Sequence, residues 1–309
     1  MDKKWTVVII VLIVLALISF ALSALISKFV SLDTTGEPGV RLGKGNIALI
    51  SIKGAIMPSD GFNILTGQGV SSDSIIRDIE RADRDPRIKA LLFEINSPGG
   101  AAVASQEVAD AVKAVEKFKV AWIREAGASG AYWVASATDK IVASPLSITG
   151  SIGVLASYLD FSGFLNDHNV TYQRIVGGKY KDMGSPMKSL TDEERVILQE
   201  SIDEMHRFFV KEVAINRNLP LDYVEGIATG AFYTGTKAKE LGLIDELGSK
   251  AKAVELVEKE LNIEATVIVY KEKVTFLDAL TKMSSDVSYK VGQGIGSVLL
   301  DKGSVQVLT

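Results

Sequence analysis

From Asn46 onward, short runs of apolar residues alternate with stretches in which apolar residues recur three and four positions apart. The short runs predict buried strands, and the spaced stretches predict helices. The predicted strands are residues 47–52, 88–95, 120–123, 140–143, 171–176 and 265–270. The predicted helices are residues 71–82, 101–118, 129–137, 161–166, 236–241 and 250–261, with a longer one after residue 191. This alternation indicates an α/β fold with a mostly parallel sheet covered by helices.

The longest predicted helix begins with a capping box formed by Thr191 and Glu194. Its predicted inner face consists of apolar residues at helical spacing: Leu198, Ile202, Met205, Phe209 and Val213. A second amphipathic pattern covers residues 276–298. It predicts a helix that packs on its own domain or on a neighbouring subunit. Binding along a membrane surface is the alternative, which a polar face without strong basic character disfavours.

Residues 5–26 are almost wholly apolar and carry no charge. Their length fits the roughly 20 residues that a transmembrane helix needs, so the segment predicts an uncleaved N-terminal membrane anchor. A cleaved signal peptide is the alternative, with small residues at 21–24 as its cleavage site. The apolar region of such a peptide normally spans only about 7–15 residues. Positive charges are nearly balanced around the span, so charge alone does not orient it.

The amino-acid composition limits which kinds of functional site the chain can form. The chain contains no cysteine, which excludes disulfides, thiolate metal sites and cysteine nucleophiles. Its formal net charge is -4 and it has no basic run, so nothing indicates nucleic-acid binding. The two histidines, His168 and His206, leave little scope for metal sites or histidine-based catalysis. We therefore expect no metal, no cofactor and no nucleic-acid partner.

The stretch Gly127-Ala-Ser-Gly-Ala-Tyr-Trp-Val-Ala-Ser136 surrounds the hydroxyl of Ser129 with small residues and continues as a predicted helix. A serine at a turn that opens a helix lies beside the free N-terminal amides and the positive end of the helix dipole. Such a place suits a nucleophile, although small residues also serve tight helix packing. A second glycine turn, Gly99-Gly100, likewise runs from a predicted strand into a helix. Both turns can therefore share the sheet edge at which sites of parallel sheets lie.

A serine hydroxyl is a poor nucleophile unless a base activates it. Each of the two histidines is more simply an ordinary surface or core residue, and lysine is the other established base for serine. Lys179 and Lys181 follow a predicted strand and could project into the same edge. A lysine base must be neutral near pH 7, well below its ordinary pKa of about 10.4, which requires desolvation or nearby positive charge. Either lysine can equally be a solvated surface charge, and spacing does not choose between them.

Three segments in this order resemble the signal peptide peptidase A family. They are Asn96-Ser-Pro-Gly-Gly100, Ala128-Ser-Gly-Ala-Tyr-Trp133 with Ile148-Thr-Gly-Ser-Ile-Gly-Val154, and Gly178-Lys-Tyr-Lys-Asp182. The family comprises serine–lysine peptidases with the Clp protease/crotonase-like fold, a superhelix of ββα units with a mostly parallel sheet. The similarity extends from about Asn46 to Gly248, and the predicted N-terminal transmembrane helix agrees with it.

The resemblance implies a catalytic dyad. Ser129 matches the nucleophile and Lys181 matches the general base, while Lys179 stands before the matching position. Ser151 matches the serine that hydrogen-bonds and orients the lysine amine.

The resemblance also implies an oxyanion hole. One donor would be the backbone N–H of Gly130, and the other an amide of the Gly99–Gly100 turn, with Gly100 the first choice. Two such amides suit a tetrahedral intermediate. Ala131 departs from the pattern, because many members have a second glycine there, but alanine is small enough to fit.

The implied function is that of a membrane-anchored serine endopeptidase, outside the cytoplasm, that degrades remnant signal peptides and other short apolar or unfolded segments. The short form of the family assembles as an octameric homo-oligomer whose neighbouring subunits supply the serine and the lysine. The expected organisation is a cytoplasmic tip and transmembrane anchor (1–30), a linker (31–45), a catalytic domain (46–262) and a C-terminal strand with a helical extension (263–309).

Competing interpretations fit less well. The related membrane serine–lysine protease that cuts stomatin-like proteins shares the fold and the dyad, but it is commonly joined to further membrane spans. A Clp-type protease would need a histidine near position 154, where the chain has Val154. Crotonase-type acyl-CoA chemistry would leave Ser129 and Lys181 without a role. A non-catalytic membrane-anchored scaffold is disfavoured because Ser129, Ser151, Lys181 and the glycine pair occur together.

Overall fold

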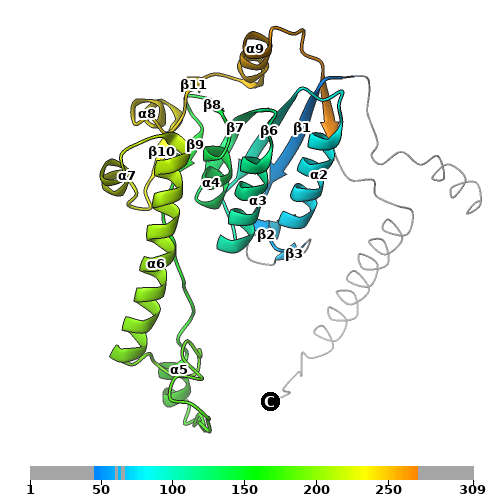
Figure 1. Cartoon of the computed structure of the whole chain (residues 1–309). Helices are drawn as coiled ribbons and strands as arrows, with labels where there is room; N and C mark the ends of the chain where they lie inside the picture. The colour runs from blue at the N-terminus through cyan, green and yellow to red at the C-terminus, as the bar shows by residue number, and fades with distance from the viewer. Residues whose placement is uncertain (1–44, 60–61, 64–66, 271–309) are drawn as a thin grey trace, which may run out of the picture. The chain divides into compact units, whose positions relative to one another are not determined.

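The computed structural model describes residues 45–59, 62–63 and 67–270 (Figure 1). These residues belong to one compact unit, Arg41–Lys271. The predicted anchor at residues 5–26 and the predicted amphipathic helix at residues 276–298 lie outside the described residues. Within the described ranges, no helix combines the length and the apolar character that crossing a bilayer requires.

The described residues contain an eight-stranded sheet in which every neighbouring pair is parallel except β9 with β10. The path runs β10-β9-β7-β6-β1-β12, and β8 pairs with both β7 and β11. The strands are β1 Ile47–Lys53, β2 Ile56–Met57, β3 Phe62–Asn63, β4 Gly67–Gln68, β5 Val70–Ser71, β6 Ala90–Ser97, β7 Phe118–Ala128, β8 Lys140–Ala143, β9 Ile148–Gly150, β10 Phe232–Thr234, β11 Glu246–Leu247 and β12 Val267–Tyr270. The predicted α/β fold with a mostly parallel sheet is confirmed, and it fits the Clp protease/crotonase-like arrangement.

Helices cover both faces of this sheet (Figure 1). They are α2 Ser72–Arg84, α3 Ala102–Ala114, α4 Gly130–Ser136, α5 Ser162–Asp167, α6 Asp192–Arg217, α7 Leu221–Ile227, α8 Gly235–Glu240 and α9 Lys250–Leu261. Each face of the sheet has its own hydrophobic core. Alternate residues of β1 belong to different cores, because successive side chains of a strand point to opposite faces. Ala48 and Ile50 pack with α2, α3 and α4. Ile47 and Leu49 pack with α9.

The predicted helix at residues 101–118 is wrong at its end, because α3 stops at Ala114 and β7 begins at Phe118. Val115 is extended and only 4% exposed, so its side chain turns into the core. The Lys117 amine then donates to the carbonyl oxygens of Ala82 at 2.9 Å and Asp85 at 2.8 Å, at the end of α2. The burial of Val115 and the hydrogen bonds of Lys117 therefore end the helix earlier than its apolar pattern predicts.

The short helix α4 is fully buried along its whole length. The Tyr132 hydroxyl donates to the Leu243 carbonyl oxygen at 2.8 Å, and burial raises the pKa of this phenol. The Trp133 ring stacks on Phe209 of α6 with 4.8 Å between centroids. The helix that follows the candidate nucleophile therefore has a fixed position between the sheet and α6.

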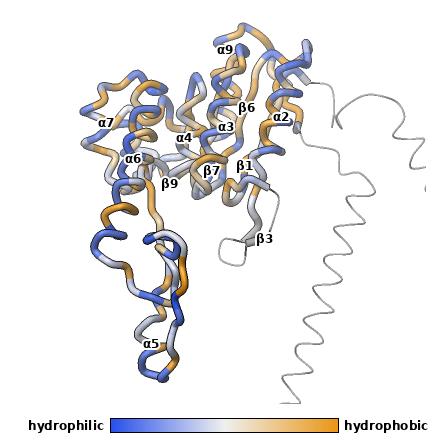
Figure 2. The backbone as a smooth tube through the Cα atoms, turned by 60° about the horizontal axis from the view of Figure 1, so that its bottom comes forward, coloured by the Kyte–Doolittle hydropathy of each residue, from blue (hydrophilic) through white to orange (hydrophobic). Residues whose placement is uncertain are grey.

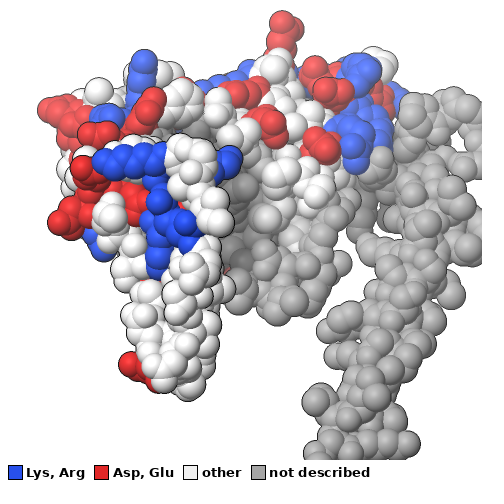
Figure 3. All heavy atoms as spheres, turned by 90° about the horizontal axis from the view of Figure 1, so that it is seen from below, with Lys and Arg blue, Asp and Glu red and all other residues white. Residues whose placement is uncertain are grey.

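Between β9 and α6 the chain leaves the sheet, and it returns along α6 (Figure 1). We call residues 154–208 the arm. Large apolar side chains of the arm are exposed: Leu155, Leu159, Phe164, Val170, Ile175, Val196 and Phe208. Apolar and polar segments alternate along it (Figure 2). Figure 3 shows a lobe with few charged side chains next to a patch where basic and acidic side chains mingle.

Two predictions for the arm need correction. Residues 171–176 form no strand, although their pattern predicted one. A strand needs a neighbouring strand for its backbone hydrogen bonds, and this exposed segment has none among the described residues. The predicted inner face of α6 is buried only near its end, at Phe209 and Val213, whereas Met205 is 49% exposed. The capping box of Thr191 and Glu194 is confirmed.

Candidate active site

Ser129 lies at the turn between β7 and α4, at the N-cap of that helix. Its backbone has φ 54° and ψ -127°, a region that a non-glycine residue rarely adopts. The Ser129 amide donates to the Gly150 carbonyl oxygen at 2.8 Å, and its carbonyl accepts from the Trp133 amide at 3.0 Å. Its side chain makes no capping hydrogen bond and is partly exposed. The turn therefore holds the hydroxyl in a strained position with no local partner, as active-site nucleophiles often are.

A bulge in the sheet brings the two predicted glycine turns together. The register between β6 and β7 shifts after Ile95, so Ser97 lies opposite Gly127. The Asn96 side-chain oxygen accepts the Ala126 amide at 3.1 Å across this bulge. Bulges of this kind commonly lie next to active sites.

Gly99 lies directly against the nucleophile turn. Its φ is 102°, and a Cβ there would come within 2.9 Å of the Ser129 Cβ and 2.8 Å of the Gly130 nitrogen. Only glycine permits both the dihedral angle and this approach. The Gly99 amide donates to the Ser97 hydroxyl at 3.1 Å. Of the two amides on this turn, that of Gly99 is therefore already engaged.

The Gly100 amide points toward α4. Ile56 donates to the Gly99 carbonyl and accepts from the Ala101 amide, both at 2.9 Å. Because successive amides of an extended chain point in opposite directions, the Gly100 N–H between them faces away from Ile56. A Cβ on Gly130 would lie 3.6 Å from the Gly100 nitrogen. Gly130 is the first residue of α4, and its N–H lacks an acceptor within the helix.

Ser151 is brought beside Ser129 by the parallel pairing of β7 and β9. The register joins Ala128 to Gly150, so the next residues along the two strands are Ser129 and Ser151. Ser151 also has a positive φ, 50°. Its hydroxyl donates to the Gly230 carbonyl oxygen at 3.2 Å.

Lys181 and Ser129 are not brought together within one copy of the chain. The Tyr180 hydroxyl donates to the Glu193 carboxylate at 3.1 Å. Because Lys181 follows Tyr180 directly, this bond places Lys181 near the start of α6. Trp133, whose amide bonds Ser129, stacks on Phe209 of the same helix. The 16 positions from Glu193 to Phe209 correspond to about 24 Å of helix. A lysine side chain cannot span that separation.

Lys179, the other lysine of this loop, is engaged locally. Its amine forms an ion pair with Glu193, and this hydrogen bond raises its pKa. That direction opposes a role as neutral base. Lys181 is exposed, and its amine bonds no described residue. The structure thus separates two lysines that the sequence pattern left equivalent.

In the part of the chain that the structure describes, neither histidine hydrogen-bonds Ser129. His168 bonds the Phe164 carbonyl in the arm, and His206 lies on α6 with a buried ring nitrogen that has no partner among the described residues. In those same residues, no cluster of histidine, aspartate and glutamate side chains could hold a metal ion.

The sequence interpretation did not assign Asn96 and Ser97 a role in shaping the site, although their side chains accept the Ala126 and Gly99 amides. It used the Asn96–Gly100 motif only as a family signature. A polar pair directly before two glycines is nevertheless a signal, because Asn and Ser side chains commonly bond backbone groups at turns.

Replacing Gly100 with alanine should move the proposed oxyanion amide. The added Cβ would lie 2.0 Å from the Ile56 carbonyl oxygen, so the turn must shift. Loss of one oxyanion donor typically costs about 100- to 1,000-fold, and we expect a fall in kcat/KM of at least about 100-fold. Gly226→Ala is the matched control, because a Cβ there meets nothing within 4 Å. Peptide hydrolysis measures both variants, and near-normal activity of Gly100→Ala would contradict the assignment.

Comparison with known proteins shows that the chain is similar to peptidases. The model of peptidase family S49 matches residues 111–264. A putative protease of Methanocaldococcus jannaschii is 35% identical over 243 residues, which cover 78% of each chain. A putative signal peptide peptidase SppA of Enterococcus faecium is 33% identical over 233 residues, 74% of this chain and 68% of the relative. The chloroplastic serine protease SPPA of Arabidopsis thaliana is 29% identical over 85% of this chain but only 38% of its own length.

Proposed function

Because the chain belongs to peptidase family S49, a family of serine proteases, we propose that it is a membrane-anchored endopeptidase in which Ser129 attacks the peptide bond and Lys181 of a neighbouring copy is the general base. The observation that carries the proposal is the free Ser129 hydroxyl at a strained turn, beside the amides of Gly130 and Gly100. A nucleophile and two converging donors are the parts that acyl transfer needs.

The reaction begins when neutral Lys181 takes the Ser129 proton as Oγ attacks the peptide carbonyl carbon. The carbonyl oxygen becomes negative and is held by the N–H groups of Gly130 and Gly100. Lys181 then gives its proton to the departing amine as the C–N bond breaks, which leaves an acyl group on Ser129. Water then attacks this ester while Lys181 accepts the water proton. Lys181 returns that proton to Ser129 Oγ as the C–O bond breaks, and the product acid leaves. In this proposal Ser151 orients the lysine amine.

Two features support a shared site. Within one copy, the Lys181 loop and the Ser129 turn are held at positions of α6 about 24 Å apart. The arm also exposes large apolar side chains, such as Leu159 at 70% and Ile175 at 96%. Contiguous exposed apolar surface commonly marks a protein–protein interface. A head-to-tail contact between copies would close a ring, and the resemblance implies eight subunits.

The proposed substrates are remnant signal peptides and other short apolar or unfolded segments. The uncharged apolar residues 5–26 support an anchor that keeps the enzyme at the membrane, with the catalytic domain outside the cytoplasm. An extended substrate would add to a free backbone edge near the site. Digestion of intact cells by an added protease tests the location, since a domain on the cytoplasmic side would be protected.

The function is tested with the full chain in detergent micelles. We expect hydrolysis of apolar fluorogenic peptides, and an activated peptide ester should leave its acyl group on Ser129, as mass spectrometry can locate. Acylation of another residue would move the nucleophile. An assembled chain that neither hydrolyses nor acylates would favour the scaffold interpretation.

A further inference from the structure

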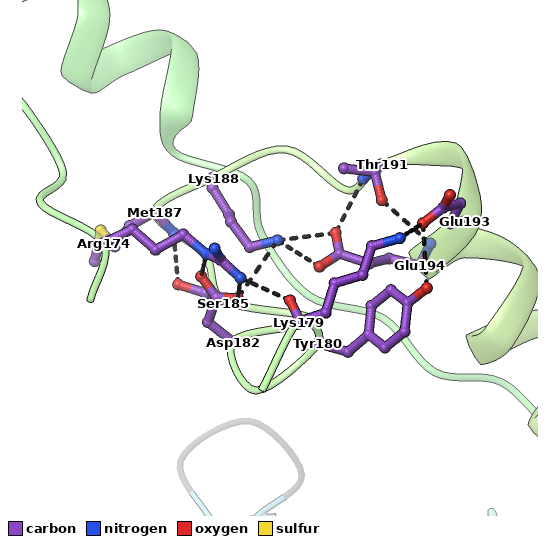
Figure 4. A network of polar contacts seen from close by, with 10 residues as sticks. All are labelled: Arg174, Lys179, Tyr180, Asp182, Ser185, Met187, Lys188, Thr191, Glu193 and Glu194. Atoms are coloured by element: carbon purple, nitrogen blue, oxygen red, sulfur yellow. Dashed lines mark hydrogen bonds and ion pairs between the residues drawn. The ribbon is translucent and has the colours of Figure 1, made fainter. Parts of the chain in front are cut away.

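One guanidinium ties down the backbone on both sides of Lys181. Arg174 donates to the Asp182 carboxylate through Nε at 2.7 Å and Nη2 at 2.9 Å, and Nη2 also donates to the Lys179 carbonyl oxygen at 2.7 Å (Figure 4). Bidentate pairs of this kind fix geometry as well as charge. The Asp182 side chain is only 10% exposed. Arg174 therefore bridges the residue after Lys181 and the second residue before it.

A second cation connects this pair to α6. Lys188 donates to both Glu194 carboxylate oxygens, at 2.6 Å and 2.8 Å, and lies 3.9 Å from Asp182 (Figure 4). Glu194 also accepts the Thr191 amide at 3.0 Å in the capping box. The loop that carries Lys181 is thereby joined to the first turn of a 26-residue helix.

Within this network the Lys181 side chain is left free. The Lys181 amide donates to the Gly178 carbonyl oxygen at 3.2 Å, and the Ser185 amide donates to the Asp182 carbonyl at 3.0 Å, so two turns flank the residue. Its amine bonds no described residue, whereas the Lys179 amine is held by Glu193. The loop therefore presents one unengaged amine from a restrained backbone.

The negative charge of Asp182 must be balanced by a nearby positive charge if Lys181 is to act as a base. An adjacent carboxylate favours the ammonium form of a lysine, which is the wrong form for a base. Hydrogen bonding from Arg174 holds the pKa of Asp182 below its usual range, so the carboxylate is ionised when the enzyme works. The charged groups of the network that holds this loop come from the loop itself, from α6 and from the segment before α5: Arg174, Lys179, Asp182, Lys188, Glu193, Glu194 and Asp160.

We propose that Arg174 is a positioning residue for catalysis, which acts through Asp182 to aim Lys181 at a neighbouring Ser129 and to cancel the carboxylate charge beside the base. The inference rests on the proposed function. It gives a role to residues 171–176. This exposed segment lies outside the sheet and places the Arg174 guanidinium against the loop that carries Lys181.

The test is the pH dependence of kcat/KM for Arg174→Gln and Asp182→Asn in the full chain. Arg174→Gln removes the closer of the two cations beside Asp182 and leaves only Lys188 at 3.9 Å, so the ascending limb should move to higher pH by on the order of half a unit. Asp182→Asn removes the carboxylate that pairs with Arg174, while Lys188 stays paired with Glu194, so the limb should move to lower pH. Both should lower kcat by about 10- to 100-fold with little change in KM, because the base is less well aimed.

Two further variants separate charge from geometry. Arg174→Lys keeps the charge but loses the bidentate contact, so kcat should fall while the limb stays in place. Arg84→Gln is the matched control, because Arg84 forms an exposed ion pair with Glu80 at 2.7 Å on α2, and both kcat and the limb should stay normal. If Arg174→Gln fails to assemble, Asp182→Asn and Arg174→Lys decide.

The outcomes distinguish this inference from the proposed function. In Arg174→Gln and Asp182→Asn, losses of kcat without movement of the limb, or shifts of the limb in the same direction, would reduce Arg174 to a structural role and overturn the inference. If Lys181→Ala itself keeps near-normal turnover, the proposed function fails as well. If Lys181→Ala is inactive while the limb stays fixed in both charge variants, only the positioning role is lost.

Discussion

Ser129→Ala is expected to abolish peptide hydrolysis, with a fall in kcat/KM of about 10,000-fold or more. The alanine has no oxygen to attack the carbonyl carbon, and the neighbouring Ser151 hydroxyl is engaged with the Gly230 carbonyl oxygen at 3.2 Å. The residual rate would come from the amides of Gly130 and Gly100 and from substrate binding alone. Peptide hydrolysis by the purified full chain measures this effect, with Ser74→Ala on α2 as a control that should stay active.

The strained backbone sharpens this prediction. Ser129 has φ 54°, a value that suits glycine, so a Ser129→Gly variant should be as inactive as Ser129→Ala but at least as stable as the wild type. A position that costs stability in exchange for activity is typical of functional sites. Thermal unfolding of the three proteins checks this order. A Ser129→Gly protein that unfolds earlier than Ser129→Ala would show that the turn is not strained.

The sheet and the serine turn could be predicted because their signals are local. Buried apolar runs identify parallel strands, as at residues 140–143, which form β8 with the predicted bounds. Gly99 and Ser129 follow strands, and the carboxyl ends of neighbouring strands meet at one edge of the sheet. Ser151 was singled out only by the family resemblance, and the structure places it beside Ser129 because the parallel register continues from Gly150.

The lysine half of the site could not be placed in this way. Residues 171–176 have the composition of a strand, but a strand depends on a partner that no local pattern reveals. Treating them as a strand put Lys179 and Lys181 at the sheet edge, whereas the chain carries them out along the arm (Figure 1). Spacing also could not distinguish the two lysines, because the difference lies in a contact with Glu193 on another element.

Mixing two inactive variants gives the most decisive test of a site shared between copies. Ser129→Ala and Lys181→Ala should each be inactive, the second because the hydroxyl loses its base. In a head-to-tail ring assembled from equal amounts of both, about one quarter of the sites would pair an intact Ser129 with an intact Lys181 from the neighbour. Co-expression with two different affinity tags, followed by tandem purification, isolates mixed assemblies for the hydrolysis assay.

The control is Lys181→Ala co-expressed with the Ser129→Ala/Lys181→Ala double variant, which contains no intact lysine and should recover nothing. Recovery in the first mixture but not in the control requires that the dyad form between copies, because no single chain in it carries both groups. A mixed assembly that stays inactive would instead place the dyad within one chain. The arm would then have to close over the sheet and abandon the roughly 24 Å that α6 places between the two groups.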